Sequence, residues 1–236
     1  TLKNHGVEII LERAELTGPH EIRLAGGRTV TAKYILIAVG AWPAVADFPG
    51  SEHMSTSNEM FHLEKLPETI IISGGGYIAN EFAGIFNGLG SDVTVVNRSD
   101  IILRGYDESV RDRLIQISLA KGISYEFNCA FDKIEKRDDG ALDVYMDGKK
   151  DPIRADIVLA ATGRRPKVDG LGLETAGVAV DDRNAIIVDE YSRTNVENIY
   201  AVGDVTDRVQ LTPIAIREGQ AFADTVFGDN PRTVDY

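Results

Sequence analysis

Residues 68–97 read ETIIISGGGYIANEFAGIFNGLGSDVTVVN, and the pattern of this stretch decides the fold. Residues 68–73 form a short apolar run that predicts a strand, and the glycines of residues 74–76 follow it directly. Apolar residues recur at helical spacing in residues 78–89, after which glycine predicts the end of the helix. A second apolar run, residues 92–96, predicts the next strand. The order strand, glycine turn, helix and strand is typical of a dinucleotide-binding unit.

The glycine turn matches the pattern G-x-G-x-x-A. In that pattern Gly74 makes the tight turn, Gly76 lets the backbone approach a pyrophosphate, and Ala79 allows the helix to pack closely on the strand. The N-terminus of the helix directs N–H groups and a positive dipole end at the phosphates. We therefore expect the dinucleotide to be bound by Gly74, Gly76, Tyr77, Ile78 and Ala79.

The end of the second strand predicts which dinucleotide binds. An NAD site places an acidic residue there, about 20 positions after the glycines, to bind the ribose hydroxyls. Here that position is Asn97, Arg98 follows at once, and Arg104 comes shortly after. Two cations and no carboxylate favour the additional phosphate of NADP, so we expect NADPH as the cofactor.

The chain also repeats a longer pattern. Residues 6–43 and 122–166 each open with a glycine and a predicted strand and continue with β-prone segments broken by turn signals. Each copy then ends in a buried strand that stops at a glycine, Gly40 or Gly163. The second copy follows the dinucleotide motif, whereas no such motif stands before the first copy. From the repeat we expect a first strand–glycine–helix unit upstream of Thr1.

Composition narrows the class of protein. The formal net charge is −12, so the chain as a whole repels nucleic acid and anionic membranes. No apolar run reaches the ~18–20 residues of a membrane span. The single cysteine, Cys129, lies in a strand-like stretch, residues 123–131, and is expected to be a small buried core residue. One cysteine cannot form an internal disulfide or supply several thiolates to a metal, so we expect no metal site and a reducing, cytoplasmic compartment.

The C-terminal third holds a second candidate site. Gly203 and Asp204 follow an apolar strand, where the carboxylate can accept hydrogen bonds from sugar or ribityl hydroxyls. Thr212 is predicted to cap a helix that has Pro213 at its first position and ends near Phe227. The positive N-terminal end of that helix suits negative charge on a reduced flavin.

Five motifs run in order along essentially the whole chain. They are GGGYIANE (74–81), NRSDIILRGYD (97–107), ATGRRP (161–166), TNVENIYAVGDV (194–205) and LTP (211–213). Together they resemble the pyridine nucleotide–disulfide oxidoreductases. Within that family, the GYIANE segment, the two arginines and the VGDVTDRVQLTP run are most similar to the members that reduce glutathione disulfide.

The resemblance implies an α/β fold with two related Rossmann-like nucleotide-binding domains that carry β-meanders, which is the FAD/NAD(P)-binding fold. Residues 1–45 would belong to the FAD-binding domain and residues 46–165 to the NADPH-binding domain. Residues 166–236 would return to the FAD-binding domain and lead to a dimerisation domain outside this chain. A homodimer is therefore implied.

The resemblance also implies residue roles in flavin binding. Gly203 and Asp204 would bind the FAD ribityl chain, and Gly40 would lie against the flavin side. Leu211 and Thr212 would lie near the flavin ring.

On the other side of the reaction, Gly163 would approach the NADPH backbone. Tyr77 is similar to a tyrosine that covers the flavin and moves aside when NADPH binds. Glu81 matches a glutamate that pairs with a lysine near flavin N5, and that lysine would lie upstream. Tyr77 and Glu81 are therefore the catalytic residues expected within this chain.

The implied reaction is reduction of a small disulfide, with glutathione disulfide expected first: hydride passes from NADPH to FAD and on to a redox-active cysteine pair. That cysteine pair and the His-Glu pair of the family are missing from the residues shown, so we expect the chain alone to be inactive. Some members of the family carry an arginine that contacts a substrate carboxylate. At the aligned position this chain has Gln220, and Arg217 lies one turn earlier.

The disulfide substrate therefore stays open at this point. The alternatives within the family are trypanothione, dihydrolipoamide and mercuric reductases. The dihydrolipoamide type is disfavoured because it would be expected to have an acidic residue near Asn97. An alternative of a different class is a nucleotide-binding module without catalysis.

Overall fold

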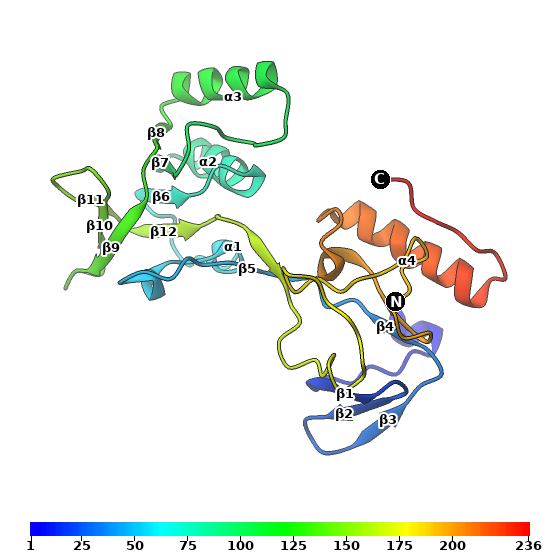
Figure 1. Cartoon of the computed structure of the whole chain (residues 1–236). Coiled ribbons are helices and arrows are strands. Elements are labelled where there is room, and N and C mark those ends of the chain that lie inside the picture. The colour runs from blue at the N-terminus through cyan, green and yellow to red at the C-terminus, as the bar shows by residue number, and fades with distance from the viewer. The chain divides into compact units, whose positions relative to one another are not determined.

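The computed structural model describes all 236 residues and divides into two compact units. Unit 1 comprises Thr1–Trp42 and Arg165–Tyr236, and unit 2 comprises Pro43–Arg164. Figure 1 labels the main elements of both units along the chain. None of the helices combines the length and the apolar character that a bilayer-spanning segment needs.

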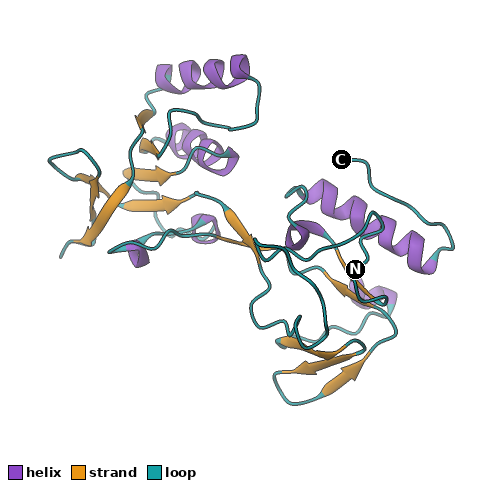
Figure 2. Ribbon diagram, in the orientation of Figure 1, coloured by secondary structure: helices purple, strands orange, loops and turns teal.

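Unit 2 is built on a parallel sheet with the strand order β12-β6-β7-β8. The strands are β6 (Thr69–Ser73), β7 (Asp92–Asn97), β8 (Ser124–Phe127) and β12 (Ile157–Ala160). Helix α2 (Tyr77–Leu89) connects β6 to β7, and helix α3 (Glu108–Ala120) connects β7 to β8, as Figure 2 shows. The predicted order of strand, glycine turn, helix and strand is thus confirmed.

Alternation along β6 assigns its side chains to two cores. Ile70 and Ile72 pack with Phe82 and Phe86 of α2, whereas Ile71 belongs to the core on the opposite face of the sheet. All three isoleucines are at most 2% exposed. A strand that is buried on both faces has to be apolar throughout, which explains the unbroken apolar run in the sequence.

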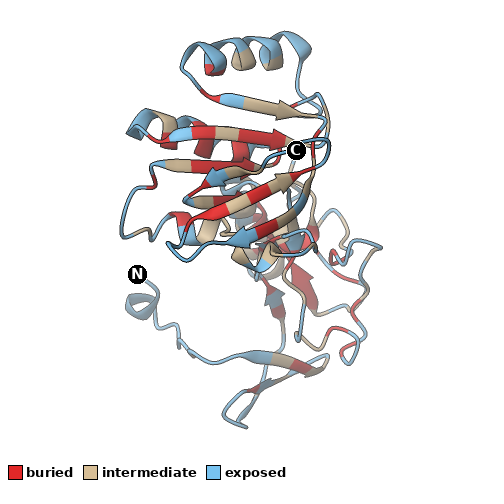
Figure 3. Cartoon of the chain, turned by 90° about the vertical axis from the view of Figure 1, so that its left-hand side faces the viewer, coloured by how far each residue is buried: buried red, intermediate tan, exposed pale blue.

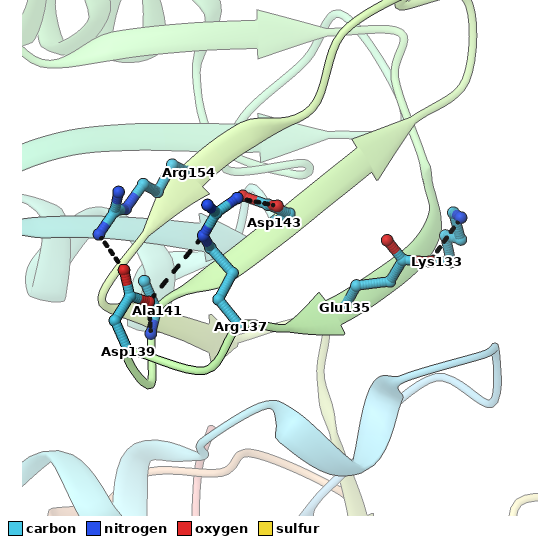
Figure 4. Close-up of polar contacts among 7 residues, drawn as sticks. All are labelled: Lys133, Glu135, Arg137, Asp139, Ala141, Asp143 and Arg154. Atoms are coloured by element: carbon cyan, nitrogen blue, oxygen red, sulfur yellow. Dashed lines mark hydrogen bonds and ion pairs between the residues drawn. The ribbon is translucent and has the colours of Figure 1, made fainter.

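That opposite face carries an antiparallel meander of β9 (Phe131–Lys136), β10 (Leu142–Met146) and β11 (Ile153–Ala155). Leu142, Val144 and Met146 of β10 are buried in the core there. The outward side chains form ion pairs, among them Arg137 with Asp143 at 2.7 Å between nitrogen and oxygen (Figure 4). Exposed pairs of this kind contribute little to stability, but they keep the outer face of the meander polar. The 3₁₀-helix η2 (Ser51–His53) and the short helix α1 (Ser57–Met60) complete unit 2.

Unit 1 holds the first copy of the repeat. Its elements are η1 (Leu2–His5), the antiparallel meander β1 (Ala14–Gly18), β2 (Glu21–Leu24) and β3 (Thr29–Thr31), and the parallel pair β4 (Ile35–Ile37) and β14 (Ile199–Ala201). The 3₁₀-helix η3 (Gly203–Thr206) follows β14, and helix α4 (Thr212–Phe227) comes shortly after it. The core of unit 1 is centred on β4 and β14, whose buried residues include Ile35, Ile37 and Ile199.

The two copies of the repeat end in the same way. Gly40 (φ 71°) and Gly163 (φ 143°) both adopt backbone conformations that favour glycine. Each is followed at once by a short strand, β5 (Ala41–Pro43) or β13 (Arg164–Pro166), and these two strands form a two-stranded sheet. The division between the units falls within this pair of strands.

Three local expectations are wrong. The strand expected after Gly6 at the start of the first copy is absent: residues 7–11 form no strand, pair with no strand of the chain and are largely exposed (Figure 3). Cys129 is buried as expected but lies in the loop between β8 and β9, because Asn128 has a φ of 53° that ends the strand. Thr212 does not cap α4, since the carbonyl of Leu211 already accepts the first helical hydrogen bonds.

Candidate functional site

The candidate site in unit 2 begins where β6 stops. Gly74 follows β6 with a φ of 131°, which side chains other than glycine rarely adopt. Its N–H donates to the carbonyl of Val96 in β7 at 2.9 Å between nitrogen and oxygen. A Cβ at Gly74 would lie 2.3 Å from the carbonyl oxygen of Ala161, directly after β12. Gly74 therefore lets the ends of three neighbouring strands converge, in addition to making the turn.

The next two glycines have different roles. A Cβ at Gly75 would lie 2.8 Å from Nδ2 of Asn97, so the turn is in close contact with the end of β7. Gly76 is the N-cap of α2, and no atom lies within 4 Å of the Cβ position there. Its φ of −78° is ordinary, so the conformation does not require glycine. The open space above Gly76 is instead available to a ligand that approaches the backbone.

Asn80 holds the turn in place from within α2. Its Nδ2 donates to the carbonyl of Gly76 at 2.8 Å and to the carbonyl of Gly75 at 3.2 Å. Both carbonyls are thereby turned toward the helix. Sequence analysis missed Asn80, because an asparagine inside a predicted helix carries no distinctive signal.

Asn97 organises the loop that follows β7. Its Nδ2 donates to the carbonyls of Ser99 at 3.0 Å and Ile101 at 2.9 Å. A carboxylate at this position would have no N–H to donate and could not make these bonds. The amide therefore shapes the loop that carries Arg98 and Arg104. The sequence indicated only that this position lacks an acid, so this structural role is additional.

A pocket of about 560 Å³ opens beside this turn and loop. Its walls are formed by Gly75, Gly76, Tyr77, Asn97, Arg98, Ser99, Ile101, Leu103, Arg104 and Tyr106. The volume falls in the range of ~300–1,000 Å³ that is typical of small-molecule sites. Neither Arg98 nor Arg104 is engaged in an ion pair. The open space above Gly76, the helix N-terminus and the two unpaired guanidinium groups fit the pyrophosphate and the additional phosphate of NADPH.

The residues predicted from α2 lie in three environments. Tyr77 is 42% exposed and lines the pocket. Ile78 packs against the core, and Ala79 is completely buried in it. Glu81 is exposed and lies outside the pocket walls. The contact of Ile78, Ala79 and Glu81 with a cofactor therefore stays a prediction.

Unit 1 brings a second group of predicted residues together after β14. Gly203 has a φ of 74° and opens η3, and Asp204 is its partly buried second residue. Element η3 packs against α4, whose N-cap Leu211 and first residue Thr212 are both exposed. No side chain caps this helix. An uncapped helix N-terminus and a carboxylate at a strand end fit the charge and the hydroxyl groups of a flavin dinucleotide.

Gly40 and Gly163 each leave open space at the position of a Cβ. The carbonyl of Gly40 accepts a hydrogen bond from the N–H of Lys167 at 3.0 Å, and that of Gly163 accepts one from Ala44 at 2.9 Å. Each glycine therefore presents backbone that a ligand can approach, and contact of Gly40 with the flavin and of Gly163 with NADPH stays a prediction.

Helix α4 carries Gln220, the position at which the sequence did not decide between the candidate disulfide substrates. Gln220 is exposed, and its Nε2 donates to Oδ1 of Asp224 at 2.9 Å. Asp224 also pairs with Arg232 at 2.6 Å. Arg217 is exposed one turn before Gln220. The amide is thus engaged with a carboxylate of its own helix, and the guanidinium of Arg217 lies at the solvent-facing surface.

Comparisons with known proteins identify the family of the chain. The profile of the pyridine nucleotide-disulphide oxidoreductases matches residues 1–219. The chain is 49% identical to a glutathione reductase of Nostoc sp., over 98% of the chain and 52% of the relative, and 48% identical to one of Burkholderia cepacia, over 96% and 50%. A trypanothione reductase of Trypanosoma congolense is 46% identical over 87% of the chain and 42% of its own length.

Among solved structures, the HOCl-induced flavoprotein disulfide reductase RclA from Escherichia coli superposes with a TM-score of 0.90 at 30% sequence identity. The match covers 96% of this chain and 52% of that one. The chain thus spans about half the length of the proteins it matches. The glycine turn, the repeated meanders and these similarities agree, and the chain belongs to the pyridine nucleotide-disulphide oxidoreductase family.

Proposed function

We propose that the full-length protein containing this chain is an NADPH- and FAD-dependent disulfide reductase that acts on glutathione disulfide and serves redox homeostasis. The observation that carries the proposal is the pocket of unit 2, where the glycine turn meets the unpaired Arg98 and Arg104. The similarity to two glutathione reductases over nearly the whole chain supports the choice of substrate.

When bound, the two cofactors would supply hydride and electron transfer to a disulfide. The residues of this chain would bind and orient them. The backbone at Gly76 and the N-terminus of α2 would hold the pyrophosphate of NADPH, and Arg98 and Arg104 its additional phosphate. Tyr77, exposed at the pocket wall, would cover the flavin until NADPH binds, with Glu81 supporting a lysine outside this chain.

In unit 1, Asp204 would accept hydrogen bonds from the ribityl hydroxyls of FAD. The N-terminus of α4, at Leu211 and Thr212, would stabilise negative charge on the flavin ring. Gly203 and Gly40 would let the backbone approach the same cofactor.

Trypanothione disulfide is the second candidate substrate. It is supported by the similarity to a trypanothione reductase and by Gln220, whose amide is already bonded to Asp224 and presents no cation to a substrate carboxylate. For glutathione disulfide, Arg217 one turn earlier would have to supply that cation.

The assembly and compartment follow from the same proposal. A homodimer is supported by the family resemblance, which implies a dimerisation domain beyond residue 236. A reducing compartment such as the cytoplasm is supported by the single, buried Cys129, which forms no disulfide within the chain. No nucleic acid or membrane partner is proposed for a chain with a net charge of −12.

The test is to purify the full-length protein and measure its flavin spectrum and its NADPH oxidation with each disulfide in turn. The proposal expects bound FAD and the largest kcat/KM with glutathione disulfide. A larger kcat/KM with trypanothione disulfide, dihydrolipoamide's oxidised form or mercuric ion would move the assignment to that reductase. A protein that binds NADPH but holds no flavin and turns over none of these would be a nucleotide-binding module instead.

A further inference from the structure

Helix α4 contains a fully buried carboxylate that neither candidate site uses. The side chain of Glu218 is 1% exposed, and Glu218 is the only charged residue among the buried polar residues of the chain. Burying an ionisable group is costly unless hydrogen bonds and opposite charge compensate for the lost water. A carboxylate in the core therefore requires hydrogen-bond donors or a cation as partners.

Glu218 has three partners from three separate segments of unit 1. The backbone N–H of Gly203 donates to Oε2 at 2.5 Å. The guanidinium of Arg208, just after η3, lies 3.0 Å from Oε1. The hydroxyl of Tyr236 donates to Oε1 at 2.6 Å. One side chain thus connects the turn after β14, the loop after η3 and the C-terminal segment to α4.

The contact to Gly203 fixes the residue directly before Asp204. Gly203 has a φ of 74°, and a Cβ there would lie 3.2 Å from the Cβ of Ala215, one turn before Glu218. The turn therefore packs directly on the face of α4 that carries Glu218, with the Gly203 N–H directed into the carboxylate. Rotation of this peptide would have to break a charge-assisted hydrogen bond in the core.

Arg208 extends the same network. Its guanidinium also donates to the hydroxyl of Ser192 at 3.0 Å and to that of Thr206, the last residue of η3, at 3.3 Å. Both hydroxyl residues are buried. The two ends of η3 are consequently held by Glu218, one through Gly203 and the other through Arg208.

We propose that Glu218 is a positioning residue that sets the orientation of Asp204 toward the flavin, by holding both ends of η3 against α4. This inference rests on the proposed function, in which Asp204 binds FAD. It assigns to Glu218 an effect on cofactor affinity in addition to any effect on folding.

The test compares Glu218→Gln with Asp224→Asn in the full-length protein. Gln preserves the shape and the acceptor for Gly203 but removes the charge that Arg208 and Tyr236 face. Asp224→Asn is the matched control, because it removes the charge of a carboxylate of the same helix that pairs with Arg232 and does not touch η3. The measurements are the FAD dissociation constant and the melting temperature at rising FAD concentrations.

The expected result is a rise of about tenfold or more in the FAD dissociation constant of Glu218→Gln, and less than twofold in Asp224→Asn. At saturating FAD, tenfold corresponds to about 1.4 kcal/mol less stabilisation by the cofactor. A merely structural role would lower the melting temperature at every FAD concentration alike and leave the dissociation constant unchanged, and that result overturns the inference.

Tyr236→Phe keeps the question decidable if Glu218→Gln does not fold, because it removes a single hydroxyl donor at the edge of the network. A severalfold rise in its FAD dissociation constant supports the inference, and a value equal to that of the unmodified protein overturns it. If the unmodified protein itself holds no FAD, the proposed function fails and the inference fails with it. The two failures are therefore distinguishable: the proposed function fails if the unmodified protein does not bind FAD, and the inference alone fails if the unmodified protein binds FAD and the variants bind it equally well.

Discussion

Replacing Arg98 and Arg104 together by alanine should abolish the preference for NADPH over NADH. The two guanidinium groups line the pocket beside the glycine turn, and neither is engaged in an ion pair. A phosphate that enters the pocket therefore has no carboxylate to displace. The 2′-phosphate is the only group that distinguishes the two cofactors, so its contacts determine the preference.

The magnitude follows from the exposure of the two side chains. A hydrogen bond between charged groups contributes about 1.5–3 kcal/mol. Arg98 and Arg104 are both exposed, and salt screens exposed charges over about 8 Å at physiological ionic strength, so the low end applies. Two such contacts give about 3 kcal/mol, which corresponds to roughly a hundredfold preference at 1.4 kcal/mol per tenfold.

The assay is the ratio of kcat/KM for NADPH to that for NADH in the full-length protein, measured at two salt concentrations. The unmodified ratio should be on the order of a hundred at physiological salt and should fall at higher salt, because screening weakens phosphate contacts. The double variant should raise KM for NADPH and leave KM for NADH nearly unchanged. Arg113→Ala is the matched control, since it removes an exposed arginine of α3 outside the pocket walls.

Two results would refute the reasoning. One is an unmodified enzyme that uses both cofactors equally, which would mean that the pocket does not bind the 2′-phosphate. The other is a double variant whose ratio stays at the unmodified value, which would place the discriminating contacts on other residues. A fall in the ratio of Arg113→Ala equal to that of the double variant would point to net charge rather than to the pocket.

Three further outcomes are expected. Gly76→Ala should weaken dinucleotide binding at an unchanged melting temperature, because its Cβ enters open space, whereas Gly74→Ala should destabilise unit 2 by placing a Cβ 2.3 Å from a carbonyl oxygen; equal melting temperatures for the two variants would contradict this. Asp204→Ala should release flavin on dialysis, and full retention would remove Asp204 from the cofactor site. Burial, and then the hydrogen bond to Glu218, raise the pKa of Tyr236 from 10.0 to about 12, so the folded state favours the protonated hydroxyl. Its stabilising effect should be fully present below pH 10.0 and lost as pH rises to about 12, and urea unfolding of Tyr236→Phe should lack that part of the alkaline decline.

The glycine turn and its flanking elements could be predicted because their signals are local. The apolar run of β6 and the helical spacing of α2 are set by residues close together in the chain, and burial follows from the same periodicities. Residues 7–11 have a comparable β-prone composition but form no strand, because a strand also needs a neighbour to receive its backbone hydrogen bonds. The corresponding opening strand of the second copy is β8, and its neighbour is β7, with which it pairs.

The function of Asn97 could be predicted only in part. Its position at the end of β7 follows from the spacing after the glycines, and the absence of an acid there indicated NADP. That its amide holds the carbonyls of Ser99 and Ile101 depends on the path of the loop, which no periodicity describes. Local loop geometry therefore decides how the pocket presents Arg98 and Arg104, while the sequence indicates only that they are near.

Glu218 shows that a signal can be present in the sequence and still be undecidable there. On α4, helical spacing places Glu218 on the same face as the buried Ala221 and Phe222, so a charged residue stands at a core position. Glutamate is mostly exposed in proteins. A glutamate within an apolar helical pattern is therefore as consistent with a helix whose buried face lies elsewhere as with a buried charge. What decides between them is compensation by Gly203, 15 residues away, and Tyr236, 18 residues away, and these partners come together only through the fold. A charge at a core position of an amphipathic helix therefore points to partners that are distant in the chain, and here those partners lie in the turn that carries Asp204 and in the C-terminal segment that contains Tyr236.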